Sequence, residues 1–430
     1  MHGQDRIFAK CAWRLIPFMG LLYLVSFIDR TNAGFAALTM NKDFGFSPAV
    51  FGFGAGVFFV GYALFQVPAN VILERVGAKR WVFCILAIWG LLSASNAMVQ
   101  SPLSFYAVRF LLGVAEAGFF PGMLLYLTYW FPRRYLARFT ANFMVAIPLS
   151  YAVGGPLSSL ILGMDGLAGF HGWQWLFLLE GVPAVLLSFA ALKLLPDGPK
   201  DASWLTIDEK KAIAARLGAE DPPGRPELWR ALCDLRVLAL GVANFAFQAS
   251  SYGIGLWLPQ IVQAMGFSNR ATGFVVALPF VAGAAAMILG GRSSSLRGER
   301  IWHVALPWLL AASSFALASV LHSNLLVLVA LTVGLIGLFA AQGTFFSVPS
   351  SFLRGTAQAG GIGLFNTLGS LGGFLGPSLI GMLKEGAGDY GTGLAAVAVG
   401  FVLSALIVLA VGRAMAPRAA IVAATSRAAG

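Results

Sequence analysis

Long uncharged stretches set the pattern of the chain. No Lys, Arg, Asp or Glu occurs in eight windows, at 44–73, 81–108, 139–164, 237–269, 271–291, 301–353, 355–383 and 390–412. Most of these windows exceed the roughly 20 residues that a helix needs to cross a bilayer. They lack the alternation of membrane β-strands, and a backbone in lipid must satisfy its hydrogen bonds within its own segment. Each window therefore predicts one or more transmembrane helices.

Twelve spans follow from this pattern. Window 301–353 is long enough for two spans, joined at the polar tip 322–324. Three further spans contain isolated charges, at about 14–38, 103–126 and 172–194. The first span carries an acid–base pair and lacks a small-residue cleavage site, so it does not resemble a cleavable signal peptide. We expect an all-α polytopic membrane protein with twelve transmembrane helices.

Composition excludes other classes of protein. Hydrophobic residues make up 58% of the 430 residues and charged residues 11%. With the 51 glycines added, the apolar share is about 70%, against roughly 45–50% in soluble domains. A soluble enzyme and a disordered chain are both excluded. Cys11, Cys84 and Cys233 have no metal-binding spacing, and we expect free thiols.

The basic residues predict an orientation. With twelve spans, 24 of the 29 Lys and Arg residues fall on one side, three on the other, and two inside the membrane. This positive-inside asymmetry predicts that both termini are cytoplasmic. It also accounts for the net charge of +11 without a nucleic-acid partner, so the expected surroundings are the lipid bilayer.

One polar stretch divides the chain into halves. Residues 196–230 form a predicted cytoplasmic linker, in which Thr206 and Glu209 have the spacing of a capping box that begins a short helix. We expect a six-helix bundle at 1–195 and another at 231–430, the second with a short cytoplasmic tail. Such 6+6 transporters bind substrate at the midplane between the halves.

A weak repeat supports the two halves. Segments 70–80 and 291–300 are both basic turns, and Gly77 and Gly298 are expected to close the helices before them. Segment 70–80 resembles the loop between helices 2 and 3 of the major facilitator superfamily, G-x-x-x-D-R-x-G-R-R. Asn70 and Glu74 replace the first Gly and the Asp of that pattern. In the second half, Ser295-Leu296 replaces the usual Asp-Arg pair, which implies a weaker charge latch there.

Four more segments resemble the anion:cation symporter family of that superfamily, over essentially the whole chain. They are Ile28-Asp29-Arg30-Thr31-Asn32, 109–121, 172–181 and 360–366. Members of that family import sugar acids, tartrate, phthalate-like and other organic anions together with protons. The resemblance implies this activity, and it assigns a gating role to the charged residues of the first loop: Glu74, Arg75, Lys79 and Arg80.

Two charged residues of the fourth span are candidates for the chemistry. A charge at mid-bilayer costs at least roughly 2.5–3.5 kcal/mol, so such residues are rare and usually functional. Arg109 and Glu116 share one helix face about 10 Å apart, too far for a direct pair. We expect Arg109 to bind a substrate carboxylate bidentately and Glu116 to carry a proton. The alternative is that each pairs with a neighbouring helix to hold the bundle.

The other intramembrane charges leave more than one interpretation open. Asp29 and Arg30 point about 100° apart on their helix. We interpret Arg30 as a second anion ligand or gate residue and Asp29 as a coupling carboxylate, as the family resemblance favours. They could instead latch the first span to another helix. Glu180 also has two interpretations, a hydrogen bond to backbone between helices or a functional role.

Uncharged groups complete the predicted site. Tyr62 resembles a substrate-contacting tyrosine of the family, and Asn366 could recognise hydroxyl groups; Asn244 and Gln248 lie one turn apart on the seventh span. Each could equally serve helix packing. Glycine-rich stretches such as 52–56 and 369–376 lie inside apolar helices, where small residues permit close helix contact.

These observations predict a secondary active transporter that imports an organic carboxylate (a sugar acid, hydroxydicarboxylate or aromatic acid) with protons by alternating access. The alternative is an uncoupled facilitator or exporter of the same fold. No nucleophile–base pair, metal-ligand cluster or cofactor motif is found, so we do not expect an enzyme, a metal or a cofactor other than the coupling proton. We expect a monomer in a bacterial inner membrane. The scheme requires the Arg109 guanidinium to face a water-filled cavity.

Overall fold

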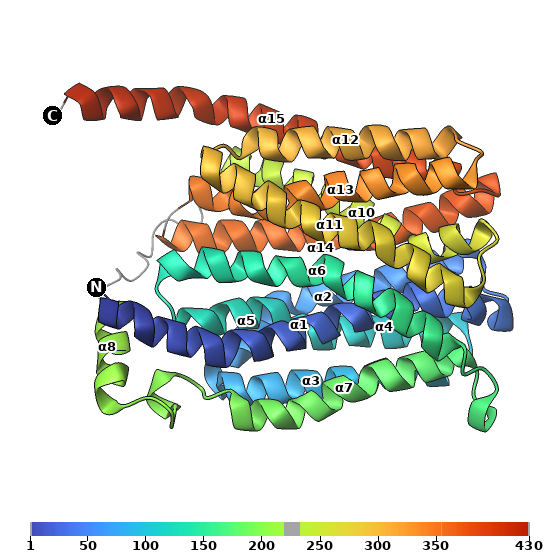
Figure 1. The fold of residues 1–430 in the computed structure, drawn as a ribbon, viewed down its shortest axis with the longest axis horizontal. Coiled ribbons are helices and arrows are strands. Elements are labelled where there is room, and N and C mark those ends of the chain that lie inside the picture. Colours follow the sequence, from blue (N-terminus) through green and yellow to red (C-terminus); the bar gives the residue numbers. More distant parts are fainter. Residues whose placement is uncertain (1, 219–232, 354, 429–430) are drawn as a thin grey trace. The chain divides into compact units, whose positions relative to one another are not determined.

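The computed structural model describes residues 2–218, 233–353 and 355–428 (Figure 1). The side chains at 2–5, 70, 74, 133–134, 136–143, 355–359 and 416–428 lie outside this description. Every regular element of the described residues is helical. In chain order they are α1 (His2–Phe44), α2 (Pro48–Val76), α3 (Ala78–Ser95), η1 (Asn96–Met98), α4 (Pro102–Glu116), α5 (Phe119–Thr128), α6 (Arg133–Leu162), η2 (Leu167–Gly169), α7 (Gly172–Leu194), η3 (Pro199–Asp201), α8 (Ile207–Gly218), α10 (Leu235–Ala264), α11 (Asn269–Arg297), α12 (Ile301–Val320), α13 (Asn324–Ser347), η5 (Pro349–Ser351), α14 (Gly355–Ala387) and α15 (Gly391–Ala428).

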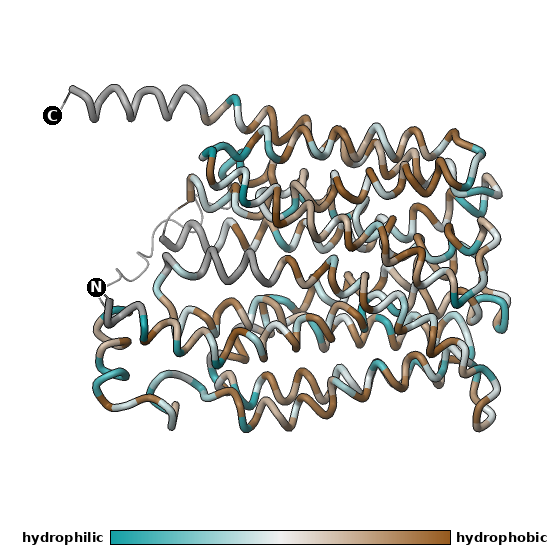
Figure 2. The backbone as a smooth tube through the Cα atoms, in the orientation of Figure 1, coloured by the Kyte–Doolittle hydropathy of each residue, from teal (hydrophilic) through white to brown (hydrophobic). Residues whose placement is uncertain are grey.

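The predicted spans correspond to these helices. Eleven segments of the described residues are long and apolar enough to cross a membrane. Figure 2 shows their hydrophobic stretches, with hydrophilic residues at the turns between them. The remaining predicted span, 355–383, forms α14, a helix of 33 residues whose many glycines make it less apolar. The all-α, twelve-span fold is confirmed.

The span predicted at 103–126 is not one continuous helix. It runs from Pro102 to Thr128, but α4 ends at Glu116 and α5 begins at Phe119. Pro121 has no N–H to donate to the Ala117 carbonyl, which removes a helical hydrogen bond at this turn. The break places Glu116 at the end of a helix.

The chain forms two compact units, which we describe separately. Unit 1 comprises Met1–Pro222, Gly255–Val281 and Pro377–Gly386, and unit 2 comprises Pro223–Ile254, Ala282–Gly376 and Ala387–Gly430. Unit 1 thus contains the first six spans together with one end each of α10, α11 and α14. The division of the chain at the linker 196–230 stays a prediction.

Close packing of α2 against α4 shapes the interior of unit 1. A Cβ added to Gly113 of α4 would lie 1.9 Å from the Phe58 carbonyl oxygen of α2, and one added to Gly61 would lie 2.4 Å from the Phe110 carbonyl oxygen. Only glycine permits backbones to approach this closely. Elsewhere in the unit, α1 packs against α6 and α7, and α3 packs against α7.

Glycines also allow the helices of the first half to approach closely those ends of α10, α11 and α14 that belong to unit 1. A Cβ at Gly34 would lie 2.6 Å from the Leu256 carbonyl oxygen, and one at Gly155 would lie 2.7 Å from the Gly273 carbonyl oxygen. At Gly52, the Pro377 carbonyl oxygen would lie at 2.5 Å. The prediction that in-helix glycines permit close helix contact is confirmed at Gly52.

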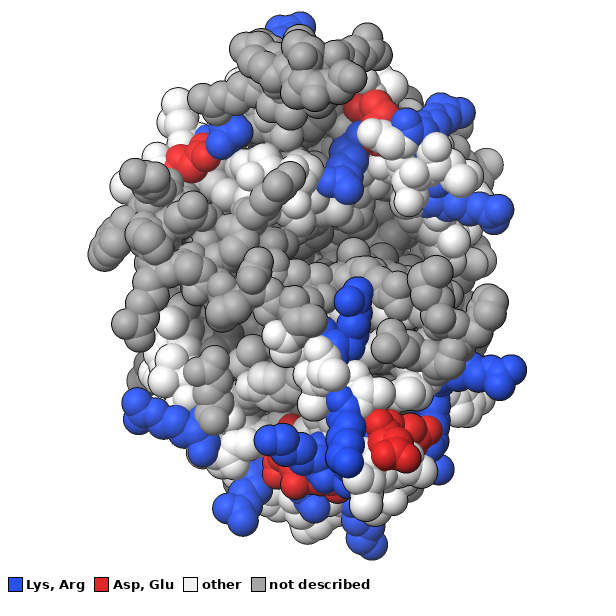
Figure 3. All heavy atoms as spheres, turned by 90° about the vertical axis from the view of Figure 1, so that its left-hand side faces the viewer, with Lys and Arg blue, Asp and Glu red and all other residues white. Residues whose placement is uncertain are grey.

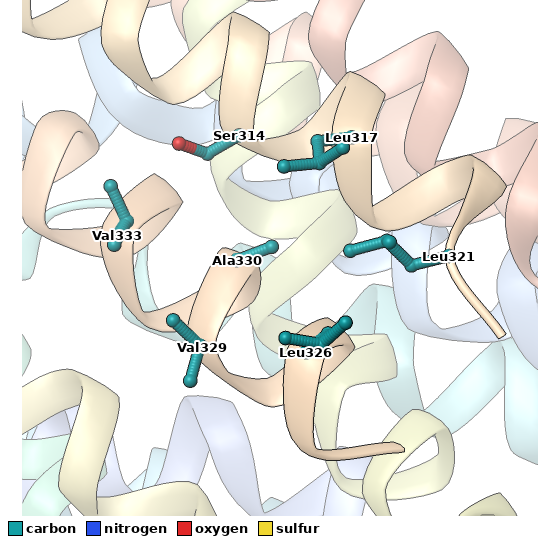
Figure 4. Close-up of a pocket in the computed structure, with 7 residues that line it drawn as sticks. All are labelled: Ser314, Leu317, Leu321, Leu326, Val329, Ala330 and Val333. Carbon is teal, nitrogen blue, oxygen red and sulfur yellow. The ribbon is translucent and has the colours of Figure 1, made fainter. Parts of the chain in front are cut away.

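In unit 2, α12 packs against α13 and α15. Helix α14 approaches α10 through Gly369, Gly372 and Gly376, where added Cβ atoms would meet α10 atoms at 2.2 Å or less. An apolar pocket lies between α12 and α13 (Figure 4), lined by Ser314, Leu317, Leu321, Leu326, Val329, Ala330 and Val333. Its one polar side chain is a hydroxyl, so it offers no charge to an anion.

The linker helix is held at one end of unit 1. Thr206 and Glu209 form the predicted capping box, with the Thr206 N–H donating to Glu209 at 2.9 Å and the Glu209 N–H donating to Thr206 Oγ1 at 3.2 Å. The Lys10 ammonium lies 2.9 Å from Glu209 and holds the pKa of that carboxyl below its usual range. Trp204 stacks on Trp130, with ring centroids 5.6 Å apart. The short helix predicted in the linker is therefore confirmed.

The predicted turns of the repeat are also found. Gly77 and Gly298 follow α2 and α11 with φ of 88° and 64°, the left-handed region that favours glycine. Figure 3 shows the face at which α8 lies, where Lys and Arg side chains gather. Which side of the membrane this face occupies stays a prediction from the charge asymmetry.

Gly113→Ala tests the α2–α4 approach. Overpacking at this contact should lower the free energy of unfolding by about 1–3 kcal/mol. Gly20→Ala is the matched control, because nothing lies within 4 Å of a Cβ there and removal of a helical glycine should stabilise by roughly 0.5–1 kcal/mol. Thermal unfolding in detergent measures both; shifts of the same sign would contradict the packing described.

Candidate functional site

Five ionisable side chains are buried together in unit 1. Asp29 and Arg30 come from α1, Arg109 and Glu116 from α4, and Glu180 from α7. None is more than 7% exposed. The five intramembrane charges singled out in the sequence are thus turned to the protein interior, the expected place for costly charges.

Arg30 and Glu116 form a buried ion pair. Arg30 Nη2 donates to Glu116 Oε2 at 2.6 Å. The guanidinium also lies over the rings of Phe27, Phe58 and Tyr62, at 4.8, 5.2 and 5.2 Å from their centroids. Arg30 is therefore committed to Glu116 in this structure, and Glu116 pairs with a neighbouring helix, which was the structural alternative for that residue.

Arg109 is buried within the charge of Asp29, Glu116 and Arg30. Its side chain has no exposed surface, and its guanidinium lies 5.1 Å from the centroid of the Phe58 ring. Among the described residues, none of its three guanidinium nitrogens has a hydrogen-bond partner. Asp29 and Glu116 act on it through charge alone. Five unused N–H donors on a buried cation make it a strong candidate receptor for an anion.

The expectation that Arg109 faces a water-filled cavity is wrong for this structure. The close approach of α2 at Gly113 brings Phe58 over the guanidinium and covers it. Of the two cluster arginines, only Arg30 keeps some exposed surface, 7%. An anion would reach Arg109 only after a rearrangement.

Asp29 is held by three donors. Trp89 Nε1 and Ser93 Oγ of α3 donate to its carboxylate, and Asn32 Nδ2 donates at 3.1 Å. The sequence interpretation missed Trp89 and Ser93, although their i, i+4 spacing in an apolar span places them on one helix face. The hydrogen bonds from Trp89 and Ser93 tie α1 to α3, and the three together supply donors to both carboxyl oxygens of Asp29.

Glu180 links two other helices. Ser158 Oγ of α6 donates to Glu180 Oε1 at 2.7 Å. The hydrogen bond between helices is found, but its partner is a side-chain hydroxyl and not the backbone group that the sequence interpretation expected.

The uncharged candidates divide between the two units. Tyr62 is buried in unit 1 beside Arg30. Asn244, Gln248 and Asn366 belong to unit 2. There Asn244 is buried and donates to the Phe365 carbonyl at 2.9 Å, which serves helix packing. Gln248 and Asn366 are partly exposed.

The predicted gating residues surround the turn at Gly77. Arg75 and Arg80 are exposed and Lys79 is partly exposed. The Lys79 backbone N–H donates to Asp197 at 2.8 Å. The Glu74 side chain lies outside the described residues. Within the described chain, no group of three His, Cys, Asp or Glu residues could hold a metal ion.

Asp29→Asn tests the network at the centre of the cluster. The amide offers one acceptor oxygen to three donors and removes a negative charge near Arg109, so we expect a loss of about 3–5 kcal/mol in the free energy of unfolding. Asp43→Asn is the control, because Asp43 also accepts an indole N–H, from Trp173 at 2.7 Å, at a partly exposed position. Equal unfolding shifts for the two variants would argue against the network.

Comparisons with known proteins identify the fold and the family. The sequence profile of the Major Facilitator Superfamily matches residues 19–377. The chain is 46% identical over 413 residues, 95% of each chain, to an Agrobacterium vitis protein whose name refers to tartrate transport. It is 40% identical over 399 residues, 92% of each chain, to a quinolone resistance transporter of Acinetobacter baumannii.

A solved structure has the same fold. A bacterial homologue of the human lysosomal transporter Spinster, in an inward-facing and occupied conformation, gives a TM-score of 0.74 at 18% identity. The match covers 93% of this chain and 96% of that one. Together with the buried intramembrane charges and the twelve spans, these matches show that the chain belongs to the Major Facilitator Superfamily and is a membrane transport protein.

Proposed function

We propose that this transporter imports a small organic carboxylate together with protons by alternating access. The observation that carries the proposal is the Arg30–Glu116 ion pair beside the unpartnered guanidinium of Arg109. One carboxylate restrains one arginine while a second arginine, next to it, has all its donors unused. This arrangement allows a proton and an anion to assist each other's binding.

A proton on Glu116 would change the cluster in two ways. It removes the negative partner of Arg30, and it gives the cluster one more unit of positive charge. Both changes favour a carboxylate, which two guanidinium groups can bind through charge-assisted hydrogen bonds. Because coupling is reciprocal, a bound anion would equally favour protonation of Glu116. Asp29, held by its three donors, then acts as a fixed counter-ion.

The substrate class rests on the chemistry of the site and on one relative. The protein from Agrobacterium vitis has a name that refers to tartrate transport, which supports a hydroxydicarboxylate. A sugar acid and an aromatic acid are the other members of the proposed class, and they rest on the family resemblance. Tyr62, beside Arg30 in unit 1, supplies a hydroxyl. Unit 2, taken by itself, carries partly exposed amides at Gln248 and Asn366. Such groups suit hydroxyl-bearing substrates.

A second candidate is an uncoupled facilitator or an exporter of the same fold. The relative from Acinetobacter baumannii favours it, because that protein is named a quinolone resistance transporter. The two functions differ in the direction of driven transport and in the role of Glu116.

The setting of this activity is also a proposal. The charge asymmetry supports cytoplasmic termini in a bacterial inner membrane. The working unit is proposed to be a monomer.

Glu116→Gln tests the coupling. The variant mimics the protonated residue permanently, so it should lose accumulation driven by a pH gradient and keep exchange of labelled substrate for unlabelled substrate. Proteoliposomes with an acidic outer medium and labelled tartrate, a sugar acid or benzoate measure both.

Glu209→Gln serves as the control, because Glu209 is a carboxyl of the linker helix, away from the cluster. That variant should accumulate substrate like the parent protein. Import by proton coupling is refuted if accumulation survives collapse of the proton gradient, or if Glu116→Gln accumulates substrate normally. Accumulation only in inside-out vesicles would favour the exporter.

Gly155→Leu tests alternating access. The new side chain cannot fit against Gly273, so it should separate α6 from α11 and expose Ser159, which is 1% exposed. Ser159→Cys, in a background lacking the native cysteines, should then react several-fold faster with a membrane-impermeant thiol reagent. Gly20→Leu, at a position where an added Cβ meets nothing within 4 Å, should not change the rate. Unchanged labelling in Gly155→Leu would show that this contact does not open.

A further inference from the structure

Glu180 is the one acid of the buried cluster that the proposed transport mechanism does not use. Its side chain is 3% exposed on α7, which packs against α1, α3 and α6. From α6, Ser158 donates to Oε1. From α1, the Asn32 side chain is close enough to interact with the carboxyl, and Asp29 is the charged group that acts on it. From α3, Trp89 and Ser93 donate to Asp29.

The charges of the cluster do not balance if every acid is ionised. Arg30 and Arg109 supply two positive charges, and Asp29, Glu116 and Glu180 would supply three negative ones. Arg30 is paired with Glu116, and Asp29 is the acid that most strongly offsets Arg109. An ionised Glu180 would therefore be an uncompensated charge in the protein interior, with a second carboxylate nearby, which is strongly unfavourable.

Hydrogen bonding leads to the same conclusion independently. Glu180 Oε2 and Asn32 Oδ1 are both buried, and neither has a hydrogen-bond partner among the described residues. Both are acceptors if Glu180 is ionised, because a carboxylate has no donor. A proton on Glu180 turns one of its oxygens into a donor, and the Asn32 side chain, which interacts with this carboxyl, has an unused acceptor. Buried polar atoms are rarely left unsatisfied, so the protonated form fits the site.

We propose that Glu180 is a second proton-binding site of the cluster, which holds its proton while Glu116 exchanges one. The neutral acid engages Asn32, and Asn32 donates to Asp29 at 3.1 Å. Glu180 is thus a positioning residue: it keeps Asn32, and through it Asp29, in place opposite Arg109. The part concerning Glu116 rests on the proposed function, whereas the protonation of Glu180 does not.

Infrared spectroscopy of the purified, substrate-free protein tests the proposal directly. A buried protonated carboxyl gives a carbonyl stretching band separate from that of carboxylates. We expect this band at neutral pH in Glu116→Gln, where Glu116 cannot contribute to it, and its loss in the Glu116→Gln/Glu180→Gln double variant. In Glu116→Gln/Ser158→Ala the band should shift, because Oε1 loses its hydrogen bond. Absence of the band from folded Glu116→Gln, or its persistence in the double variant, would overturn the proposal.

Transport measurements distinguish a failure of this proposal from a failure of the proposed function. Glu180→Gln is uncharged and keeps a donor, so it should lose much less pH-driven accumulation than Glu116→Gln. Suppose that folded Glu180→Gln loses accumulation but still exchanges labelled for unlabelled substrate. Glu180 would then release and rebind its proton during transport, which would overturn the proposal that it holds its proton. If the parent protein shows no proton-driven uptake, the proposed function fails, while the infrared band still decides the protonation of Glu180.

Discussion

The cost of charge in a low-dielectric interior is the constraint on which this structure depends. It limits charged residues to 11% of the chain, leaves long windows without any, and turns the five intramembrane charges toward one another. Each of these groups needs compensation inside the protein. Arg30 obtains it from Glu116 and Asp29 from three donors. Arg109 obtains it only through the charge of its neighbours. The incomplete satisfaction of Arg109 is the reason why we propose the cluster as a ligand-binding place as well as a tie between helices.

Glycine positions determine how closely the helices around this cluster approach. The contact at Gly113 brings Phe58 of α2 over Arg109 and near Arg30. The covering of the guanidinium is therefore a property of helix packing and not of the arginine itself. The contacts of Gly34, Gly52 and Gly155 with segments from the second half are equally close and involve backbone on both sides. Contacts of this kind bury little side-chain surface and can separate without leaving a large cavity in the core.

The sequence specified the features that depend on local spacing. Hydrophobic windows located the spans, the Thr206–Glu209 spacing located the linker helix, and Gly77 marked the end of α2. Features that depend on the rotation of one helix against another were not accessible in this way. Helical periodicity placed Arg109 and Glu116 on one face, but it could not show that Arg30 of α1 faces Glu116, or that Trp89 and Ser93 of α3 face Asp29. The covering of Arg109 depends on which residue of α2 lies opposite Gly113, which no pattern within either helix encodes.

The net charge of the buried cluster can be followed through the proposed steps of proton and substrate binding. With Glu180 neutral, two arginines face two carboxylates, and the buried group carries no net charge. Protonation of Glu116 then leaves one excess positive charge, which a monocarboxylate neutralises when it binds. A dicarboxylate would bring one negative charge more, which needs compensation from a second proton or from groups outside the cluster. At Asp29 the three donors favour the ionised form against the cost of burying its charge, so a second proton there would have to displace that hydrogen-bond network. The charge of the cluster in unit 1 therefore balances one substrate carboxylate. The second carboxylate of a substrate such as tartrate would have to bind to groups outside the cluster.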